Sequence, residues 1–147
     1  RDVARFASEF QALDSLRLAR ELDKRLHAQG RQLDVLVEVN SSGEPQKSGV
    51  APSEAVDFAR QLSAFDALRV KGLMTVALHS DDESQVACCF QRMRVVQEQL
   101  RNEASEVSSW NDLSMGMSGD FEIAIAHGAT TVRVGQAIFG SRPPMGR

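Results

Sequence analysis

The apolar positions of the chain follow two periods that alternate along its length. Ala19, Leu22 and Leu26 recur at intervals of three and four residues, which is typical of one face of a helix. Residues 33–39 instead read Leu-Asp-Val-Leu-Val-Glu-Val, a short β-branched run that is typical of a strand buried on both faces. The alternation of these patterns predicts a regular succession of strands and helices.

Five strands are predicted in this way, over residues 6–13, 33–39, 68–77, 110–115 and 130–134. Helices are predicted after them, over residues 16–29, 52–62, 80–100, 120–126 and 136–139. Local signals support these boundaries. Asp14 or Ser15 can cap the first helix, Pro52 suits the first turn of the second, and residues 80–83 form a capping-box pattern before the third.

A strand–helix unit repeated about five times predicts an α/β fold, with helices packed outside a parallel sheet. No long linker or low-complexity tract interrupts the pattern, so residues 1–147 are interpreted as one domain. An open doubly wound sheet and part of a closed barrel both fit. In either case ligands bind at the carboxyl ends of the strands. The first loops to consider are therefore those after Val39, Ala77, Met115 and Val134.

Composition narrows the class of protein. The chain is 42% hydrophobic and 25% charged, with a formal net charge of -3 and scattered Lys and Arg residues, which argues against a nucleic-acid surface. No apolar run is long enough to span a bilayer, and the mixed charges of the first ten residues do not fit a signal peptide. Cys88 and Cys89 are neighbours and poorly placed for a disulfide, which predicts a reducing, cytoplasmic setting.

The loop 114–120 reads Ser-Met-Gly-Met-Ser-Gly-Asp and joins a predicted strand to a predicted helix. Backbone N–H groups at a helix start, together with the Ser118 hydroxyl, can bind a phosphate. Alternatively, Ser118 only caps its own helix. A carboxylate at Asp120 would repel a phosphate unless it points away.

Residues 132–140 hold the second candidate. Arg133 lies in a strand whose other residues are apolar, so it has either a ligand or an ion-pair partner at the strand end. Gly135 allows a ligand to approach the backbone, and its N–H and that of Gln136 begin a helix. Two such turns after successive strands favour a shared anion site.

The remaining candidates are weaker. Asn40 ends a predicted strand, and Lys47 could reach back over that edge, although an exposed surface lysine is the simpler interpretation. His27, His79 and His127 are dispersed, so no metal site is predicted. The chain has neither a nucleophile elbow nor a P-loop.

Three segments resemble a known family in order and spacing: VLVEVNSSGEPQKSG, LRVKGLMTVA and LSMGMSGDFEIAIAHGATTVRVGQAIFG. They are similar to the pyridoxal phosphate homeostasis family, and the likeness runs from about Phe10 to the C-terminus. The resemblance implies a single-domain, eight-stranded (β/α) barrel of the TIM type, similar to the N-terminal domain of alanine racemase. It also implies binding of pyridoxal 5'-phosphate (PLP), with buffering or delivery of the cofactor rather than an established enzyme activity.

The resemblance assigns cofactor-binding roles to individual residues. Ser118, Gly135 and Gln136 match the positions expected at the cofactor phosphate, and Arg133 matches the arginine expected near the pyridine nitrogen. An arginine there would keep that nitrogen unprotonated and weaken PLP as an electron sink. Three strand-end or loop matches complete the set: Asn40 and Met74 as lining residues, and the Lys47-x-Gly49 pattern, without an assigned role.

One departure from the family pattern is large. The family's Schiff-base lysine lies at the end of the first barrel strand, and Lys24, Lys47 and Lys71 match none of its context. By resemblance, this chain holds about strands four to eight, so the lysine is expected upstream and no catalytic residue is assigned. Five of eight strands would leave two unpaired edges. We therefore expect self-association, an opened sheet, or completion by an N-terminal segment.

Three functions follow from the resemblance. The leading one is non-catalytic PLP binding in PLP homeostasis, with the cofactor held by phosphate and ring contacts and passed to PLP-dependent apoenzymes. The second is a fragment of an amino-acid racemase-like enzyme. The third is a remnant of the fold that binds nothing.

Overall fold

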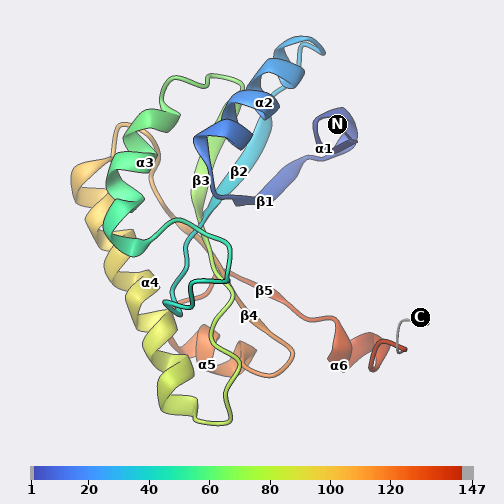
Figure 1. The fold of residues 1–147 in the computed structure, drawn as a ribbon, viewed down its shortest axis with the longest axis vertical. Coiled ribbons are helices and arrows are strands. Elements are labelled where there is room, and N and C mark those ends of the chain that lie inside the picture. Colours follow the sequence, from blue (N-terminus) through green and yellow to red (C-terminus); the bar gives the residue numbers. More distant parts are fainter. Residues whose placement is uncertain (1, 144–147) are drawn as a thin grey trace.

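The computed structural model describes residues 2–143 and contains one sheet of five parallel strands (Figure 1). Each strand pairs with the next in the chain, in the order β1-β2-β3-β4-β5, without a reversal. A doubly wound sheet would reverse its strand order. The sheet is therefore a curled half-barrel, and the predicted barrel-type α/β fold is confirmed. Its strands are β1 (Glu9–Leu13), β2 (Leu33–Glu38), β3 (Leu68–Met74), β4 (Asp112–Met117) and β5 (Thr131–Arg133).

Helices connect successive strands and cover one face of the sheet. Figure 1 shows α3 and α4 side by side on that face, with α5 packed against the far end of α4. The helices are α1 (Asp2–Phe6), α2 (Leu16–His27), α3 (Ala55–Leu62), α4 (Glu83–Glu103), α5 (Phe121–Ala126) and α6 (Gln136–Phe139), with a 3-10 turn at Pro52–Glu54. This is the strand–helix–strand arrangement expected of parallel pairing.

The hydrophobic core lies between this helical layer and the sheet. Leu26 of α2, Phe90 of α4 and Leu73 of β3 are fully buried. Trp110, just before β4, is also fully buried, and its indole Nε1 donates to the Ala104 carbonyl oxygen at 2.9 Å. The apolar stripes of α2 and α4 that the sequence shows are the faces that pack on the sheet.

The first predicted strand begins too early. Residues 2–6 form α1, and β1 starts only at Glu9. Phe6 is 72% exposed rather than part of the sheet. Arg31 holds α1 in place by donating to the carbonyl oxygens of Ala4 and Ala7, at 2.6 and 2.7 Å. Of the evenly spaced Phe6, Phe10 and Ala12, which predicted this strand, only Phe10 and Ala12 lie in β1.

Further boundaries also differ from prediction, and β3 ends at Met74 rather than at residue 77. The capping residue of α4 is Asp82, which accepts a hydrogen bond from the Ser84 backbone N–H at 2.9 Å, whereas Ser80 accepts one from the Asp82 N–H at 3.1 Å. β4 runs to Met117 instead of ending at residue 115. Ser114 is therefore a strand residue and not part of the loop that follows. Within residues 2–143, no helix has both the length and the apolar character needed to cross a membrane.

Candidate functional site

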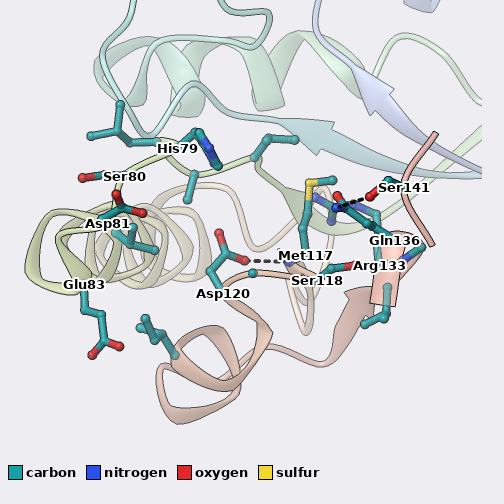
Figure 2. A pocket seen from close by; sticks show the side chains of 18 of the residues that line it. His79, Ser80, Asp81, Glu83, Met117, Ser118, Asp120, Arg133, Gln136 and Ser141 are labelled. Carbon is teal, nitrogen blue, oxygen red and sulfur yellow. Dashed lines mark hydrogen bonds between the residues drawn. The ribbon is translucent and has the colours of Figure 1, made fainter. Parts of the chain in front are cut away.

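A cavity of about 1280 Å³ opens at the carboxyl ends of β3, β4 and β5. Its walls come from three loops, over residues 76–81, 117–120 and 133–136. Figure 2 shows Ser118, Arg133 and Gln136 at one side of this cavity and His79, Ser80 and Asp81 at the other. Three of the four loops that the sequence indicated thus meet at one edge of the sheet, because parallel strands direct their carboxyl ends to the same side.

Ser118 joins the turn after β4 to the turn after β5. Its hydroxyl oxygen accepts hydrogen bonds from the backbone N–H groups of Gly135, at 3.3 Å, and Ala137, at 3.2 Å. It does not cap α5, whose capping position is Asp120. The N–H groups at the start of α6 therefore point at an oxygen atom between the two turns. Hydroxyl and amide donors so arranged fit a phosphate.

The sequence suggested the N–H groups of Gly135 and Gln136 as donors to an anion. At the Ser118 hydroxyl itself, the second amide belongs to Ala137. The Gln136 side chain lines the cavity and donates to the Ser141 hydroxyl at 3.4 Å (Figure 2). Gln136 is thus beside the predicted anion position.

The Arg133 guanidinium is held by two neutral oxygen atoms. Nη1 donates to the Ser114 hydroxyl and Nη2 to the Thr75 carbonyl oxygen, both at 2.7 Å. Burial lowers the pKa of Arg133, while the negative charges of Asp120 and Glu38 act in the opposite direction. An arginine stays protonated in proteins. Its positive charge, half-buried in the cavity wall, is available to a ligand.

Ser114 is fully buried in β4 and donates its own proton to the Gln11 side-chain oxygen on β1, at 2.6 Å. β1 and β4 are not neighbours in the sheet, so this bond crosses the interior of the half-barrel. The sequence reasoning missed both residues. The available signal was a polar side chain within a run of otherwise apolar strand positions, the same signal that identified Arg133.

Two carboxylates lie near this interior. Burial raises the pKa of Glu38, at the end of β2, and Asp14 adds to the rise, whereas Arg133 lowers it. Asp120 lines the cavity, but its Oδ1 accepts a hydrogen bond of 2.7 Å from the Met117 N–H (Figure 2). That bond ties the Asp120 carboxylate to its own turn.

The family whose description is alanine racemase, N-terminal domain, matches residues 3–143 of this sequence. The chain belongs to this family. Among curated proteins, the chain is 41% identical to a pyridoxal phosphate homeostasis protein from Helicobacter pylori. This alignment extends over 129 residues, or 87% of the chain. The match covers 55% of the Helicobacter protein, so the chain spans about half the length of the curated relative.

Solved structures agree with this family membership. An unknown protein from Bifidobacterium adolescentis is 39% identical, with a TM-score of 0.82, over 90% of this chain and 53% of its own. PipY of Synechococcus elongatus, solved with PLP bound, is 29% identical, with a TM-score of 0.85, over 94% of this chain and 63% of its own.

Two residues that the family resemblance assigned to the pocket do not line the cavity. Asn40 organises its own loop: its Oδ1 accepts from the Gly43 N–H at 3.1 Å, and its Nδ2 donates to the Glu44 carbonyl oxygen at 2.9 Å. Met74 is 7% exposed at the carboxyl end of β3. The cavity wall thus includes Ser118, Arg133, Gly135 and Gln136. Met74, although not part of that wall, pairs in register with Ser114, which accepts a hydrogen bond from Arg133.

Lys47 is not an exposed surface lysine. Its Nζ donates to the Ala77 carbonyl oxygen at 2.9 Å and pairs with the Glu44 carboxylate at 2.8 Å, with 27% of the side chain exposed. Gly49 closes the same loop at a φ of +113°, where a Cβ would lie 2.6 Å from the Asn40 nitrogen. The Lys-x-Gly pattern of the family therefore ties the loop after β2 to the segment that forms the cavity wall.

A further cluster lies at the amino ends of the strands. His27 Nε2 is 2.8 Å from Asp66 Oδ1, and His27 Nδ1 is 3.4 Å from Asp23 Oδ2. The three side chains are of metal-ligating type, with ligand atoms within 4.8 Å of one another. The sequence reasoning considered the histidines alone and missed this grouping. Because the two ring nitrogens face different carboxylates, the ring acts here as a bridge between Asp23 and Asp66.

Proposed function

We propose that this chain binds PLP in the cavity at the carboxyl ends of β3–β5. The observation that carries the proposal is the meeting of the Ser118 hydroxyl with the N–H groups of Gly135 and Ala137, beside the Arg133 guanidinium. In this proposal the phosphate lies between the two turns and the pyridine nitrogen faces Arg133. The naming of the relatives and the PLP-bound PipY structure support it.

The donor set fits the charge distribution of PLP. A phosphate needs several N–H and O–H donors, which the turns around Ser118 and Gly135 supply. An aromatic nitrogen needs one donor, which Arg133 supplies after its bonds to Ser114 and Thr75. Asp120 would oppose the phosphate, but its bond to the Met117 N–H holds the carboxylate in its own turn.

We propose a carrier role in PLP homeostasis, with release of the cofactor to PLP-dependent apoenzymes in the cytoplasm. When bound, PLP supplies an electron sink, which is stronger when its ring nitrogen is protonated. A permanently protonated arginine beside that nitrogen disfavours this state, which argues for holding the cofactor rather than using it. In the chain as given, we propose that phosphate and ring contacts hold PLP without a covalent bond.

Titration of the chain with PLP, followed by absorbance and by equilibrium dialysis, tests the proposal. We expect saturable binding and no adduct that survives borohydride reduction and dialysis. Ser118→Ala should weaken PLP binding about tenfold, because one charged hydrogen bond contributes roughly 1.5 kcal/mol or more. Ser105→Ala, at an exposed position outside the cavity, is the matched control.

Three results would contradict parts of this proposal. Equal PLP binding by the wild-type and Ser118→Ala chains would remove the phosphate assignment. Racemisation of an amino acid above the level of a heat-treated sample would favour the racemase-like alternative. Absence of any saturable PLP binding would leave a fold without this function.

We also propose that the five strands are one part of a single larger barrel. β1 and β5 each have one strand neighbour among the described residues. Ile138 and Phe139 of α6 are 68% and 85% exposed. Unpaired edges and exposed apolar side chains favour further pairing, either with another copy or with additional strands. Light scattering after size-exclusion chromatography would separate a monomer from a dimer.

A further inference from the structure

We propose that Ser114 and Gln11 are positioning residues that hold the Arg133 guanidinium in the orientation needed to meet the ring of PLP. This inference rests on the proposed function and deepens it, since it names residues outside the phosphate-binding turns. The two residues come from β4 and β1, and neither lines the cavity itself.

The hydrogen bonds along this path have a single direction. Glu9 Oε2 accepts from the Gln11 side-chain nitrogen at 2.7 Å, which turns the Gln11 oxygen toward Ser114. That oxygen can only accept, so the Ser114 hydroxyl donates to it, at 2.6 Å. The lone pairs of the Ser114 oxygen are then directed to Arg133 Nη1, at 2.7 Å.

The second anchor of the guanidinium is equally fixed. Nη2 donates to the carbonyl oxygen of Thr75, whose side chain is fully buried. The Thr75 hydroxyl donates to the Val39 carbonyl oxygen at 2.7 Å and lies 2.8 Å from the Ser41 hydroxyl. With one Nη held at β4 and the other just after β3, the plane of the Arg133 guanidinium is defined by two points. A guanidinium has five N–H groups, so donors remain for a ligand.

The burial of Ser114 supports a role beyond strand formation. It has no exposed surface and lies between Leu113 and Met115, which are also fully buried. A buried hydroxyl is unfavourable unless it is hydrogen-bonded, and an apolar side chain would suit the position in a strand. What Ser114 adds is one acceptor for Arg133, linked to a partner 103 positions away in the chain.

A purely structural role and a positioning role predict different results. If Ser114 only supports the fold, its loss weakens the binding of every ligand to the same extent. If it positions Arg133, its loss weakens contacts to the ring of PLP and leaves the phosphate-binding turns unchanged. Inorganic phosphate is a probe for those turns alone.

The test compares Ser114→Ala and Gln11→Met with the wild-type 147-residue chain. We expect the dissociation constant for PLP to rise about fivefold to tenfold in Ser114→Ala, and less in Gln11→Met, where the hydroxyl can still accept from Arg133. The constant for inorganic phosphate should stay within about twofold in both. Ser118→Ala should weaken the binding of both PLP and inorganic phosphate, because it changes the phosphate-binding turns themselves.

A second measurement does not depend on PLP. The Arg133 side-chain ¹⁵N resonance, assigned by its loss in Arg133→Lys, should shift or broaden in both variants. In Ser114→Ala the guanidinium loses an acceptor, and in Gln11→Met that acceptor is no longer fixed by Gln11. Should Ser114→Ala fail to fold, Gln11→Met, at a partly exposed position, gives the same test.

Wild-type PLP affinity in both variants, with an unshifted Arg133 resonance, would overturn the inference and leave the proposed function in place. Equal losses for PLP and inorganic phosphate would also overturn it, in favour of a structural role. If the wild-type chain binds no PLP, the proposed function fails and this inference fails with it, a result recognisable without any variant.

Discussion

Gln11 on β1 and Ser114 on β4 share a hydrogen bond of 2.6 Å, although 103 positions separate them in the chain. Two strands, β2 and β3, lie between them in the sheet. The sheet must therefore curl for these side chains to meet, and the curvature brings Arg133 to the same point. The curvature of the sheet therefore also determines which residues meet at the candidate site.

Replacement of Arg133 by Lys tests the guanidinium at the cavity wall. A lysine carries the same charge but cannot bridge Ser114 and Thr75 while also facing a ligand, because its donors sit on one nitrogen. We expect PLP affinity to fall about tenfold, which corresponds to roughly 1.4 kcal/mol. Arg69→Lys, in an exposed ion pair with Asp34, is the control for an arginine-to-lysine change. Fluorescence titration of both variants checks this, and equal affinities would refute the ring assignment.

Replacement of Lys47 by Met tests the bond between the loop after β2 and the cavity wall. The variant loses the donor to the Ala77 carbonyl oxygen. We expect the free energy of unfolding in urea to fall by roughly 1 to 2 kcal/mol, a typical value for a hydrogen bond from a charged group. The control is Lys24→Met, on the exposed side of α2, which should change the free energy of unfolding by less than about 0.5 kcal/mol. Identical urea midpoints for the two variants would mean that the loop bond contributes nothing to stability.

Replacement of Gly72 by Ala tests the close approach of β3 and β4. A Cβ at this position would lie 1.9 Å from the Asp112 carbonyl oxygen, its partner in the sheet register. The strands would have to separate, so we expect destabilisation of more than about 3 kcal/mol or failure to fold. Gly119→Ala is the matched control, because a Cβ at Gly119 would meet no other atom of the described residues within 4 Å. Near-native thermal unfolding of Gly72→Ala would disprove this pairing.

His27 makes stability depend on pH. Its pKa is raised above the ordinary value of 6.5, first by the hydrogen bond to the Asp23 backbone oxygen and then by the carboxylates of Asp23 and Asp66. A raised pKa in the folded state means that protonated His27 stabilises the fold. This contribution is complete below the unfolded pKa and is lost as the pH rises through the folded pKa.

The experiment measures urea unfolding from about pH 6, below the ordinary histidine pKa, to about pH 9. The wild-type chain should lose stability relative to His27→Gln as the pH rises. His79→Gln, at an exposed position for which no such partners exist among the described residues, should run parallel to the wild type. Parallel curves for all three proteins would show that the Asp23–His27–Asp66 bridge does not form in solution.

Several features followed from sequence patterns alone. Periodicity placed the helical faces around Leu26 and Phe90 and the buried strand 33–39, because burial of one face imposes a repeat of 3.6 or a continuous apolar run. Turn chemistry directed attention to Ser118 and Gly135, because small and hydroxyl-bearing residues after a strand leave N–H groups free. The family resemblance added the expected cofactor and the interpretation of Arg133.

Other features needed the tertiary structure. The two hydrogen-bond partners of Arg133 come from two different segments, and no local pattern can relate Gln11 to Ser114. Likewise, no local pattern relates Lys47 to Ala77, or His27 to Asp66. The chain's own sequence thus determined which segments are strands and helices and which turns carry small and hydroxyl-bearing residues, because those properties depend on neighbouring residues. Which side chains meet across the interior was decided only by the curvature and register of the sheet, since these set distances between residues far apart in the chain.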